Sequence, residues 1–199
     1  MEIRRIGVIG MGQMGRGIAE VCALSNYKVL TTDSDADILK NSKIQILADL
    51  KKLEKKNKIE FEKINSSLDQ ITLAENLSEF ETCDLIIEAA TENEQIKKRI
   101  FSDLKQFVKK STILATNTSS ISVTRLASGT EHPENFMGLH FMNPAPLMNL
   151  VELVRGIATS EKTYQILEDF VVKLGKSSSV SEDFPAFIVN RVLMPMINE

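Results

Sequence analysis

Two residues capable of acid–base chemistry stand in segments that otherwise have the composition of hydrophobic core. His140 is one of only two histidines in the 199 residues, and Glu152 follows between Val151 and Leu153. A lone glutamate buried in a strand would cost several kcal/mol or become protonated. A connection of about eight residues separates the two predicted strands, which is short enough for a hairpin-like return. We therefore expect the carboxylate to lie beside the imidazole.

Such a pair is suited to general base catalysis. The pKa of histidine lies near working pH, and a neighbouring carboxylate fixes the imidazole tautomer and stabilises the imidazolium. The alternative for His140 is a hydrogen-bonded structural histidine, which is common at such positions. The second histidine, His132, lies in the polar turn "TEHPEN" and is predicted to be an ordinary surface residue.

A glycine motif near the N-terminus predicts a dinucleotide site. Gly10, Gly12 and Gly15 form G-x-G-x-x-G between a predicted buried strand and a helix. The first glycine permits a tight turn, the second lets a pyrophosphate approach the backbone, and the third allows close packing of helix on strand. The helix N-terminus then offers free N–H groups and a positive dipole end to phosphates.

Asp33 ends the second predicted strand, at the distance expected for the acid that binds an adenosine ribose. A carboxylate there accepts hydrogen bonds from both ribose hydroxyls and repels a 2′-phosphate, which predicts NAD rather than NADP. The competing interpretation is a glycine turn with an unrelated surface aspartate. The sequence has no Gly-Lys-Ser/Thr of a Walker-type phosphate loop.

Strand and helix patterns alternate over the first 120 residues, which predicts an α/β fold. We expect a Rossmann-type, doubly wound, mostly parallel sheet with a helix-loop arm, followed by the start of a helical domain. Ligands of such sheets bind at the carboxyl ends of the strands. The predicted strands are residues 3–9, 27–33, 70–75, 83–90, 111–117, 136–141, 149–154 and 177–180. The predicted helices are residues 13–25, 35–57, 59–65, 94–108, 123–127, 160–174 and from about 186 onward.

Composition narrows the functional classes. With 43% hydrophobic residues the chain is globular, and a net charge of −3 gives no general reason to expect nucleic acid or an anionic membrane as partner. No run approaches the roughly 18 apolar residues of a membrane span, and no signal peptide is evident. We expect a cytoplasmic protein without a bound metal. Cys22 and Cys83 lack a CxxC spacing and are predicted to be plain buried thiols.

Several stretches together carry a resemblance to a known family. The chain resembles the L-3-hydroxyacyl-CoA dehydrogenase family, 3-hydroxybutyryl-CoA dehydrogenases included, in their motifs and in the spacing between them. The matching stretches are "IGVIGMGQMGRGIA", "DLIIEAATENEQIKKRIF", "TNTSSIS", "GLHFMNPAPLMNLVELV" and "FPAFIVNRVLMP".

The resemblance implies an NAD-dependent oxidoreductase that acts on (S)-3-hydroxyacyl-CoA in fatty acid metabolism. The family's catalytic pair falls on His140 and Glu152. Ser119 and Asn190 are expected to hydrogen-bond the reacting end of the substrate, although Ser119 taken alone would be interpreted as a helix N-cap. The residues expected to bind NAD are Gly10, Gly12, Gln13, Met14, Gly15, Asp33, Ala90, Glu92, Lys97, Ser119 and Asn143.

Two features of the sequence need comment beside the family pattern, one in the motif before the last helix and one in the arm. Pro185-Ala186-Phe187 replaces the usual Pro-Gly-Phe, and alanine tolerates a positive φ poorly. Lys56 aligns with a coenzyme A contact, although lysine runs are usually solvated.

The expected domains are an NAD-binding domain at 1–184, with an arm at about 35–66, and the start of a C-terminal helical domain at 185–199. In the family that domain forms the homodimer, and we expect the chain to end within its first helix.

Two other functions remain open from the sequence. One is a catalytically idle NAD-binding module on the same scaffold. The other is a β-hydroxyacid or sugar-acid dehydrogenase, but those enzymes generally rely on a catalytic lysine on a later helix, and no equivalent replaces the predicted histidine–glutamate pair.

Overall fold

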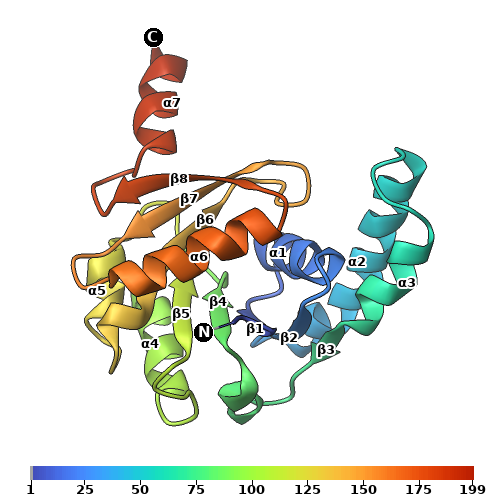
Figure 1. The fold of residues 1–199 in the computed structure, drawn as a ribbon, viewed down its shortest axis with the longest axis horizontal. Helices are drawn as coiled ribbons and strands as arrows, with labels where there is room; N and C mark the ends of the chain where they lie inside the picture. The colour runs from blue at the N-terminus through green and yellow to red at the C-terminus, as the bar shows by residue number, and fades with distance from the viewer. Residues whose placement is uncertain (1) are drawn as a thin grey trace.

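A computed structural model, which describes residues 2–199, has one eight-stranded sheet at its centre (Figure 1). The strand order is β3-β2-β1-β4-β5-β6-β7-β8, and every neighbouring pair is parallel except β6 and β7. The predicted mostly parallel Rossmann-type sheet is confirmed. The strands are β1 (Arg5–Ile9), β2 (Lys28–Thr32), β3 (Ile71–Leu73), β4 (Leu85–Glu88), β5 (Ile113–Thr116), β6 (Phe136–Phe141), β7 (Leu150–Arg155) and β8 (Ser177–Glu182).

Helices cover both faces of the sheet, and each face has its own hydrophobic cluster. Residues of α1, α2, α3 and α6 contribute to one cluster, whereas α4, α5 and the 3-10 helix η1 contribute to the other. The helices are α1 (Gln13–Leu24), α2 (Ala36–Lys55), α3 (Glu62–Asp69), η1 (Leu77–Thr82), α4 (Glu94–Leu104), α5 (Val123–Ala127), η2 (Pro133–Asn135), α6 (Glu161–Lys173) and α7 (Val189–Asn198).

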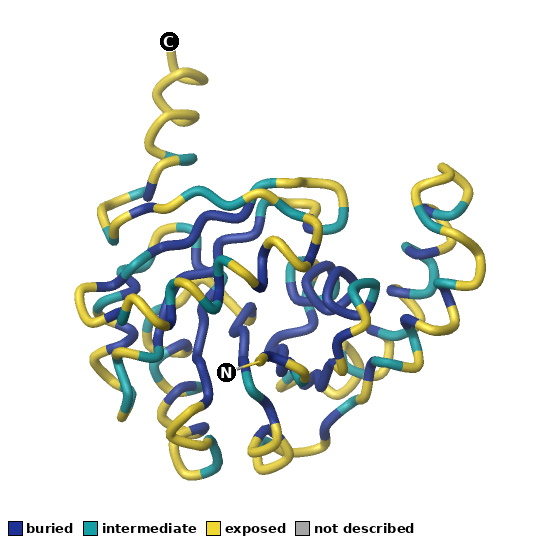
Figure 2. Tube along the Cα trace, viewed as in Figure 1, coloured by how far each residue is buried: buried dark blue, intermediate teal, exposed yellow. Residues whose placement is uncertain are grey.

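The central strands are buried on both faces, which explains their nearly continuous apolar runs. All residues of β4, β5 and β6 are buried, and Figure 2 shows these strands in dark blue under the flanking helices. Side chains alternate along each strand. Leu85 and Ile87 therefore join one cluster, while Ile86 between them joins the other.

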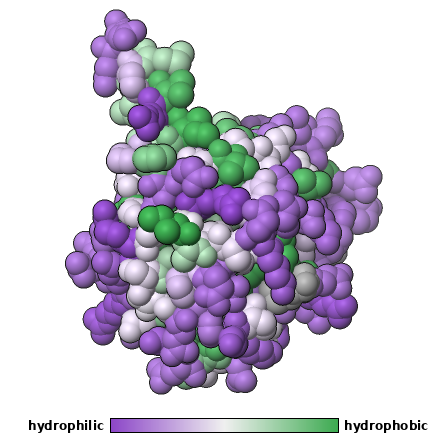
Figure 3. Space-filling model, turned by 60° about the vertical axis from the view of Figure 1, so that its left-hand side comes forward, coloured by the Kyte–Doolittle hydropathy of each residue, from purple (hydrophilic) through white to green (hydrophobic). Residues whose placement is uncertain are grey.

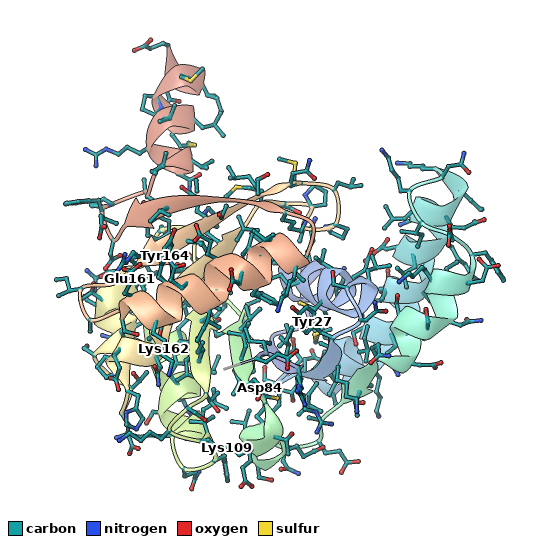
Figure 4. All side chains as sticks on the ribbon, in the orientation of Figure 1. Tyr27, Asp84, Lys109, Glu161, Lys162 and Tyr164 are labelled. Carbon is teal, nitrogen blue, oxygen red and sulfur yellow. The ribbon has the colours of Figure 1, made fainter. Side chains whose placement is uncertain are left out.

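Contacts at the edges of these clusters hold the start of the sheet in place. The Asp84 carboxylate accepts hydrogen bonds from the backbone N–H groups of Arg4 and Arg5, at 2.8 and 3.0 Å. Tyr27 packs edge-to-face on Phe170 of α6, with ring centroids 5.4 Å apart. Figure 4 shows Asp84 near the end of the sheet opposite α7 and Tyr27 beneath α6.

The paired helices α2 and α3 form the predicted arm, although some helix bounds differ from the sequence expectation. The second arm helix begins at Glu62 rather than 59, and α4 ends at Leu104 rather than 108. Ile44 is 63% exposed although it falls at helical spacing with the apolar residues Leu47 and Leu50 of α2. The arm stands out from the body, and Ile46 and Leu50 of α2 are fully buried where it meets the core.

The topology creates a crevice beside β1. The chain runs outward from β1 to β2 and β3, then returns to pair β4 with the other side of β1. This reversal is the switch point at which doubly wound sheets bind ligands, beyond the carboxyl ends of the strands. The turn after β1 holds the glycine motif, so the predicted dinucleotide turn lies at this crevice.

Helix α7 projects away from the rest of the molecule (Figure 1). None of its residues is buried, and Met196 and Ile197 are 68% and 66% exposed. Figure 3 shows hydrophobic residues on α7 and at its junction with the body. Within residues 2–199, no helix is both long and apolar enough to cross a membrane.

Glu20 is an exception to the apolar burial of α1. Its side chain is 2% exposed, and its Oε1 atom has no hydrogen-bond partner within the described part of the chain. Burial is the main cause that raises the pKa of Glu20 to about 8; nearby Asp49 adds to the rise and Lys52 opposes it. The folded protein therefore favours the neutral acid.

We predict that Glu20→Gln changes how stability depends on pH. The folded-state pKa lies above the ordinary value of 4.5, so wild type loses stability as pH rises from about 4.5 to 8. Relative to wild type, Glu20→Gln should gain about 3 kcal/mol between pH 4 and pH 7. Urea unfolding at the two pH values measures this difference. The exposed Glu81→Gln serves as control, and equal shifts in the two variants would contradict the assignment.

Candidate active site and dinucleotide cleft

The glycine turn after β1 has the geometry that the motif predicts. Gly10 has a φ of 93°, and a Cβ there would lie 2.4 Å from the Cα of Ala90. A Cβ on Gly15 would lie 1.7 Å from the carbonyl oxygen of Gly10. Helix α1 follows with Gly12 as N-cap, which has no side chain to satisfy the first N–H groups. These groups therefore remain available to an anion.

Asp33 lies beside the glycine turn. One carboxylate oxygen accepts the backbone N–H of Met11 at 2.6 Å, and the other accepts that of Asp35 at 2.9 Å. A carboxylate oxygen can accept more than one hydrogen bond, so both oxygens retain capacity for a ligand hydroxyl. Asp33 thus supports the turn and remains placed at the end of β2, where the sequence expects a ribose contact.

A cleft of about 720 Å³ opens beyond the carboxyl ends of the strands. This volume suits a bound small molecule or part of a cofactor. It brings together residues predicted for cofactor, substrate and catalysis from six separate segments. The predicted residues in its lining are Gly12, Gln13, Met14, Ala90, Glu92, Lys97, Ser119, His140, Asn143 and Asn190. Gly10, Gly15 and Asp33 lie outside that lining.

The antiparallel pairing of β6 and β7 places Glu152 directly opposite His140. The Nδ1 atom of His140 lies 2.6 Å from Oε2 of Glu152. Both side chains are buried, with 8% exposure for the histidine and 0% for the glutamate. The histidine also lines the cleft, so its imidazole lies between a buried carboxylate and a ligand-sized space.

Glu152 is held in its ionised form. Its Oε1 accepts the backbone N–H groups of Ile188 and Val189 at 2.9 and 2.8 Å, at the start of α7. Burial alone would raise the pKa of Glu152, but hydrogen bonds from His140 and from these two N–H groups outweigh burial, and the pKa lies below its ordinary value. An ionised carboxylate only accepts hydrogen bonds, so Nδ1 of His140 donates. In the neutral ring, Nε2 then keeps its lone pair.

The turn after β5 gathers hydrogen-bond donors around Glu92. Its Oε1 accepts from Thr118 Oγ1 at 2.6 Å and from the backbone N–H groups of Ser119 and Ser120 at 2.9 and 3.1 Å. Asn190 of α7 donates to the carbonyl of Ser119 at 3.2 Å. The predicted substrate residues Ser119 and Asn190 are therefore neighbours. The alternative N-cap role for Ser119 is wrong, because Ser122 caps α5.

The two lysines predicted to bind ligands, Lys97 and Lys56, lie in different surroundings. Lys97 is buried, and its Nζ lies 2.8 Å from each oxygen of the fully buried Glu88 at the end of β4. A buried pair of this kind is stable only when both charges are well satisfied. Lys56 lies outside the main cleft, beside a second hollow of about 440 Å³ between α1, α2 and the turn after β6.

The remaining candidates for chemistry have conventional surroundings. Cys22 and Cys83 are free and buried, and burial raises the pKa of both thiols, to about 12 for Cys83. This agrees with the prediction of plain thiols. His132 lies 3.2 Å from Glu134 at the surface. No group of three or more potential metal ligands occurs within residues 2–199.

Sequence reasoning missed three residues of the site. Asn117 lines the cleft and accepts the backbone N–H of Phe141 at 2.9 Å. Phe187 packs edge-to-face on the His140 ring, with centroids 5.9 Å apart. Asp183 connects the segment before α7 to α5. Asn117 and Phe187 lie in quoted motifs and were accessible from them, but the role of Asp183 depends on a chain path that no spacing reveals.

The fold and cleft define a Rossmann-type dinucleotide-binding protein, and comparisons with known proteins specify its family. Residues 5–184 match the family model described as 3-hydroxyacyl-CoA dehydrogenase, NAD binding domain. The chain is 51% identical over 197 residues to a 3-hydroxybutyryl-CoA dehydrogenase of Bradyrhizobium diazoefficiens, covering 99% of this chain and 67% of that protein. It is 42% identical to a probable 3-hydroxybutyryl-CoA dehydrogenase of Bacillus subtilis, covering 100% and 69% of the two chains.

A solved structure agrees with these relatives. The crystal structure of (S)-3-hydroxybutyryl-CoA dehydrogenase from Ralstonia eutropha matches with a TM-score of 0.96 and 38% identity, over 99% of this chain and 70% of the other. The chain therefore belongs to the 3-hydroxyacyl-CoA dehydrogenase family of NAD-dependent enzymes. The glycine turn, the uncapped start of α1 and the acid after β2 fit NAD, the family's cofactor.

The backbone before α7 gives a stability prediction. Ala186 has a φ of 67°, in the left-handed region that costs a residue with a Cβ about 1 kcal/mol. Ala186→Gly should therefore stabilise the fold by roughly 0.5–1 kcal/mol, the relieved strain being partly offset by backbone entropy. Ala48→Gly, inside α2, is the matched control and should destabilise by about 1 kcal/mol. Denaturant unfolding measures both, and a loss of stability in Ala186→Gly would contradict the strain.

Proposed function

We propose that this protein oxidises (S)-3-hydroxyacyl-CoA, such as 3-hydroxybutyryl-CoA, to the corresponding 3-oxoacyl-CoA. The observation that carries the proposal is His140 in the wall of the dinucleotide cleft, hydrogen-bonded to the fully buried Glu152. The names of the relatives support the oxidoreductase class and the substrate. The fold alone would not, because Rossmann domains host many reactions.

The pair is arranged to take a proton from a substrate hydroxyl. Nε2 of His140 carries the free lone pair and serves as general base. The proton then makes the ring an imidazolium, which the ionised Glu152 stabilises at 2.6 Å. The backbone N–H groups of Ile188 and Val189 keep that carboxylate ionised and fixed. When bound, NAD supplies the acceptor for the hydride that leaves C3 of the substrate.

Other residues orient the reactants. Ser119 and Asn190 are proposed to hold the substrate hydroxyl and thioester carbonyl near His140; their contact with each other in the cleft supports this role. Gln13 donates to Asn143 at 3.1 Å and so joins α1 to the turn after β6. The proposed NAD-binding residues are Gly10, Gly12, Gln13, Met14, Gly15, Asp33, Ala90, Glu92, Lys97, Ser119 and Asn143.

We place the coenzyme A part of the substrate against the arm. Lys56 and Arg16 line the second hollow, where Lys52 is paired with Asp49 at 2.7 Å and Glu20 is the other acid. Positive charge there attracts the phosphates of coenzyme A without demanding a fixed geometry.

Domain organisation and assembly are also part of the proposal. We assign residues 1–184 to the NAD-binding domain and 185–199 to the start of a helical domain that forms a homodimer. The exposed apolar residues of α7 support this division, since such surfaces usually meet a partner. We further propose that the protein acts in the cytoplasm, in fatty acid β-oxidation.

Replacing the proposed base tests the reaction. His140→Gln should lower kcat by at least about 10²-fold, as expected for the loss of a general base, and leave NAD affinity nearly intact. The matched control is His132→Gln, which changes the surface histidine and should leave both quantities unchanged. NADH absorbance with 3-hydroxybutyryl-CoA measures kcat, and calorimetric titration measures NAD binding. An unchanged kcat in His140→Gln would remove this residue from its role.

The same assay separates the enzyme from the idle module. Turnover of 3-hydroxybutyryl-CoA by wild type supports the proposal. NAD binding without turnover, across a series of acyl-chain lengths, would instead identify a catalytically idle module on this scaffold.

Asp33 tests the choice of cofactor. Asp33→Ala should weaken NAD binding by roughly tenfold, because it removes charged hydrogen-bond acceptors. It should also reduce the preference for NAD over NADP, since no carboxylate then repels the 2′-phosphate. Asp33→Asn removes the negative charge but keeps an oxygen that can accept the Met11 N–H. Comparing it with Asp33→Ala separates the effect of the charge from the effect of the contact with the glycine turn. Titrations with NAD and NADP measure the ratio of the two affinities. A ratio equal to that of wild type in both variants would refute the assignment.

A further inference from the structure

The segment between β8 and α7 touches both members of the His140–Glu152 pair. Phe187 is 3% exposed, and its ring packs on His140. The next two residues, Ile188 and Val189, donate their backbone N–H groups to Oε1 of Glu152. The position of this segment therefore decides whether the carboxylate has its donors and whether the imidazole has its packing partner.

The backbone of this segment does not hold itself in place. Ala186 and Phe187 are consecutive residues with φ of 67° and 50°, and neither is glycine. Left-handed conformations of such residues persist only where surrounding contacts enforce them. Helix α7 beyond the segment has no buried residue, and its support within the described residues is the single hydrogen bond from Asn190 to the Ser119 carbonyl. An anchor must therefore lie at the other end.

Asp183 provides that anchor. Its Oδ1 accepts the backbone N–H of Val123 at 2.9 Å, and its Oδ2 accepts the backbone N–H of Thr124 at 2.8 Å. The hydroxyl of Ser122 donates to the same Oδ2 at 2.6 Å. One carboxylate thus ties the end of β8 to the start of α5, and α5 follows directly on the turn that contains Ser119.

We propose that Asp183 is a positioning residue for the His140–Glu152 pair, acting through the segment from 184 to 189. The inference rests on the proposed function, because it assigns Asp183 to the support of the general base. Asp183 fixes the segment, the segment presents two N–H groups to Glu152, and Glu152 holds His140. Hydrogen bonds from Asn190 to Ser119 and from α5 to Asp183 tie the same segment to the substrate side of the cleft.

The donors require a carboxylate at this position. Three donors converge on two oxygens, and both oxygens of a carboxylate accept. An asparagine would retain one acceptor and turn an NH₂ group toward a backbone N–H. Asp183→Asn should therefore show a weaker form of the defect that Asp183→Ala shows, and it supplies a second variant should alanine prevent folding.

The deciding test is NMR spectroscopy of the chain itself, with no substrate present. Wild type should show a slowly exchanging Nδ1 proton of His140 and protected amides of Ile188 and Val189. In Asp183→Ala these two amides should exchange at least about tenfold faster, and the His140 proton should be lost to exchange. The signals of His132 and the amides of β1 to β5 should stay unchanged, because the sheet does not depend on this anchor.

Two further variants distinguish positioning from simple capping of α5. Glu182→Ala removes the neighbouring acid, whose side chain makes no hydrogen bond within the described residues, and should leave all these signals unchanged. If Asp183 only caps α5, Asp183→Ala will speed exchange at residues 125–127 and leave Ile188, Val189 and His140 as in wild type. That result would overturn the proposal.

Kinetics give an independent readout. Asp183→Ala should lower kcat about tenfold in wild type and less than about twofold in a Glu152→Gln background, because both changes act through one carboxylate. Equal losses in the two backgrounds would contradict the path through Glu152. A wild type without turnover would count against the proposed function alone, since the exchange and imidazole signals still decide the role of Asp183.

Discussion

The buried carboxylate of Glu152 is the constraint on which the site depends. A charge with no exposure is tolerated only when donors surround it, and this one receives an imidazole N–H on one oxygen and two backbone N–H groups on the other. The donors come from β6 and from the start of α7. The carboxylate therefore fixes the tautomer of His140 and joins the last strands of the sheet to the helix that follows them.

The sheet topology explains why this pair and the glycine turn share one cleft. A parallel strand delivers its carboxyl end to the crevice, which is how β1, β4 and β5 bring the glycine turn, Glu92 and Ser119 together. β6 arrives in the same direction and ends close to His140. β7 returns antiparallel, so Glu152 meets His140 across the hairpin instead of lying in a distant turn. The reversal of direction between β6 and β7 thus adds a carboxylate to a nucleotide site.

Features with a local cause were predictable from the sequence. Gly10 and Gly15 are required by backbone geometry within a few residues, and the meeting of His140 with Glu152 follows from a short connection between two apolar strands. The sequence was less informative wherever long-range packing decides. Ile44 fits the helical period, yet the arm leaves it in solvent. The donors at Ile188 are backbone groups, so residue type carries no sign of them.

The three carboxylates that are buried within the described residues are stabilised in different ways. Glu88 is neutralised by the buried Lys97 at 2.8 Å, and Glu152 shares its charge with His140 and backbone dipoles. Glu88 is the last residue of β4, and Glu152 lies in the amino-terminal half of β7, opposite His140. Glu20 has an oxygen without a partner, lies on α1 toward the arm, and has its pKa raised to about 8 chiefly by burial. The two carboxylates near the cleft thus have cationic or dipolar partners, whereas burial favours the neutral acid at Glu20.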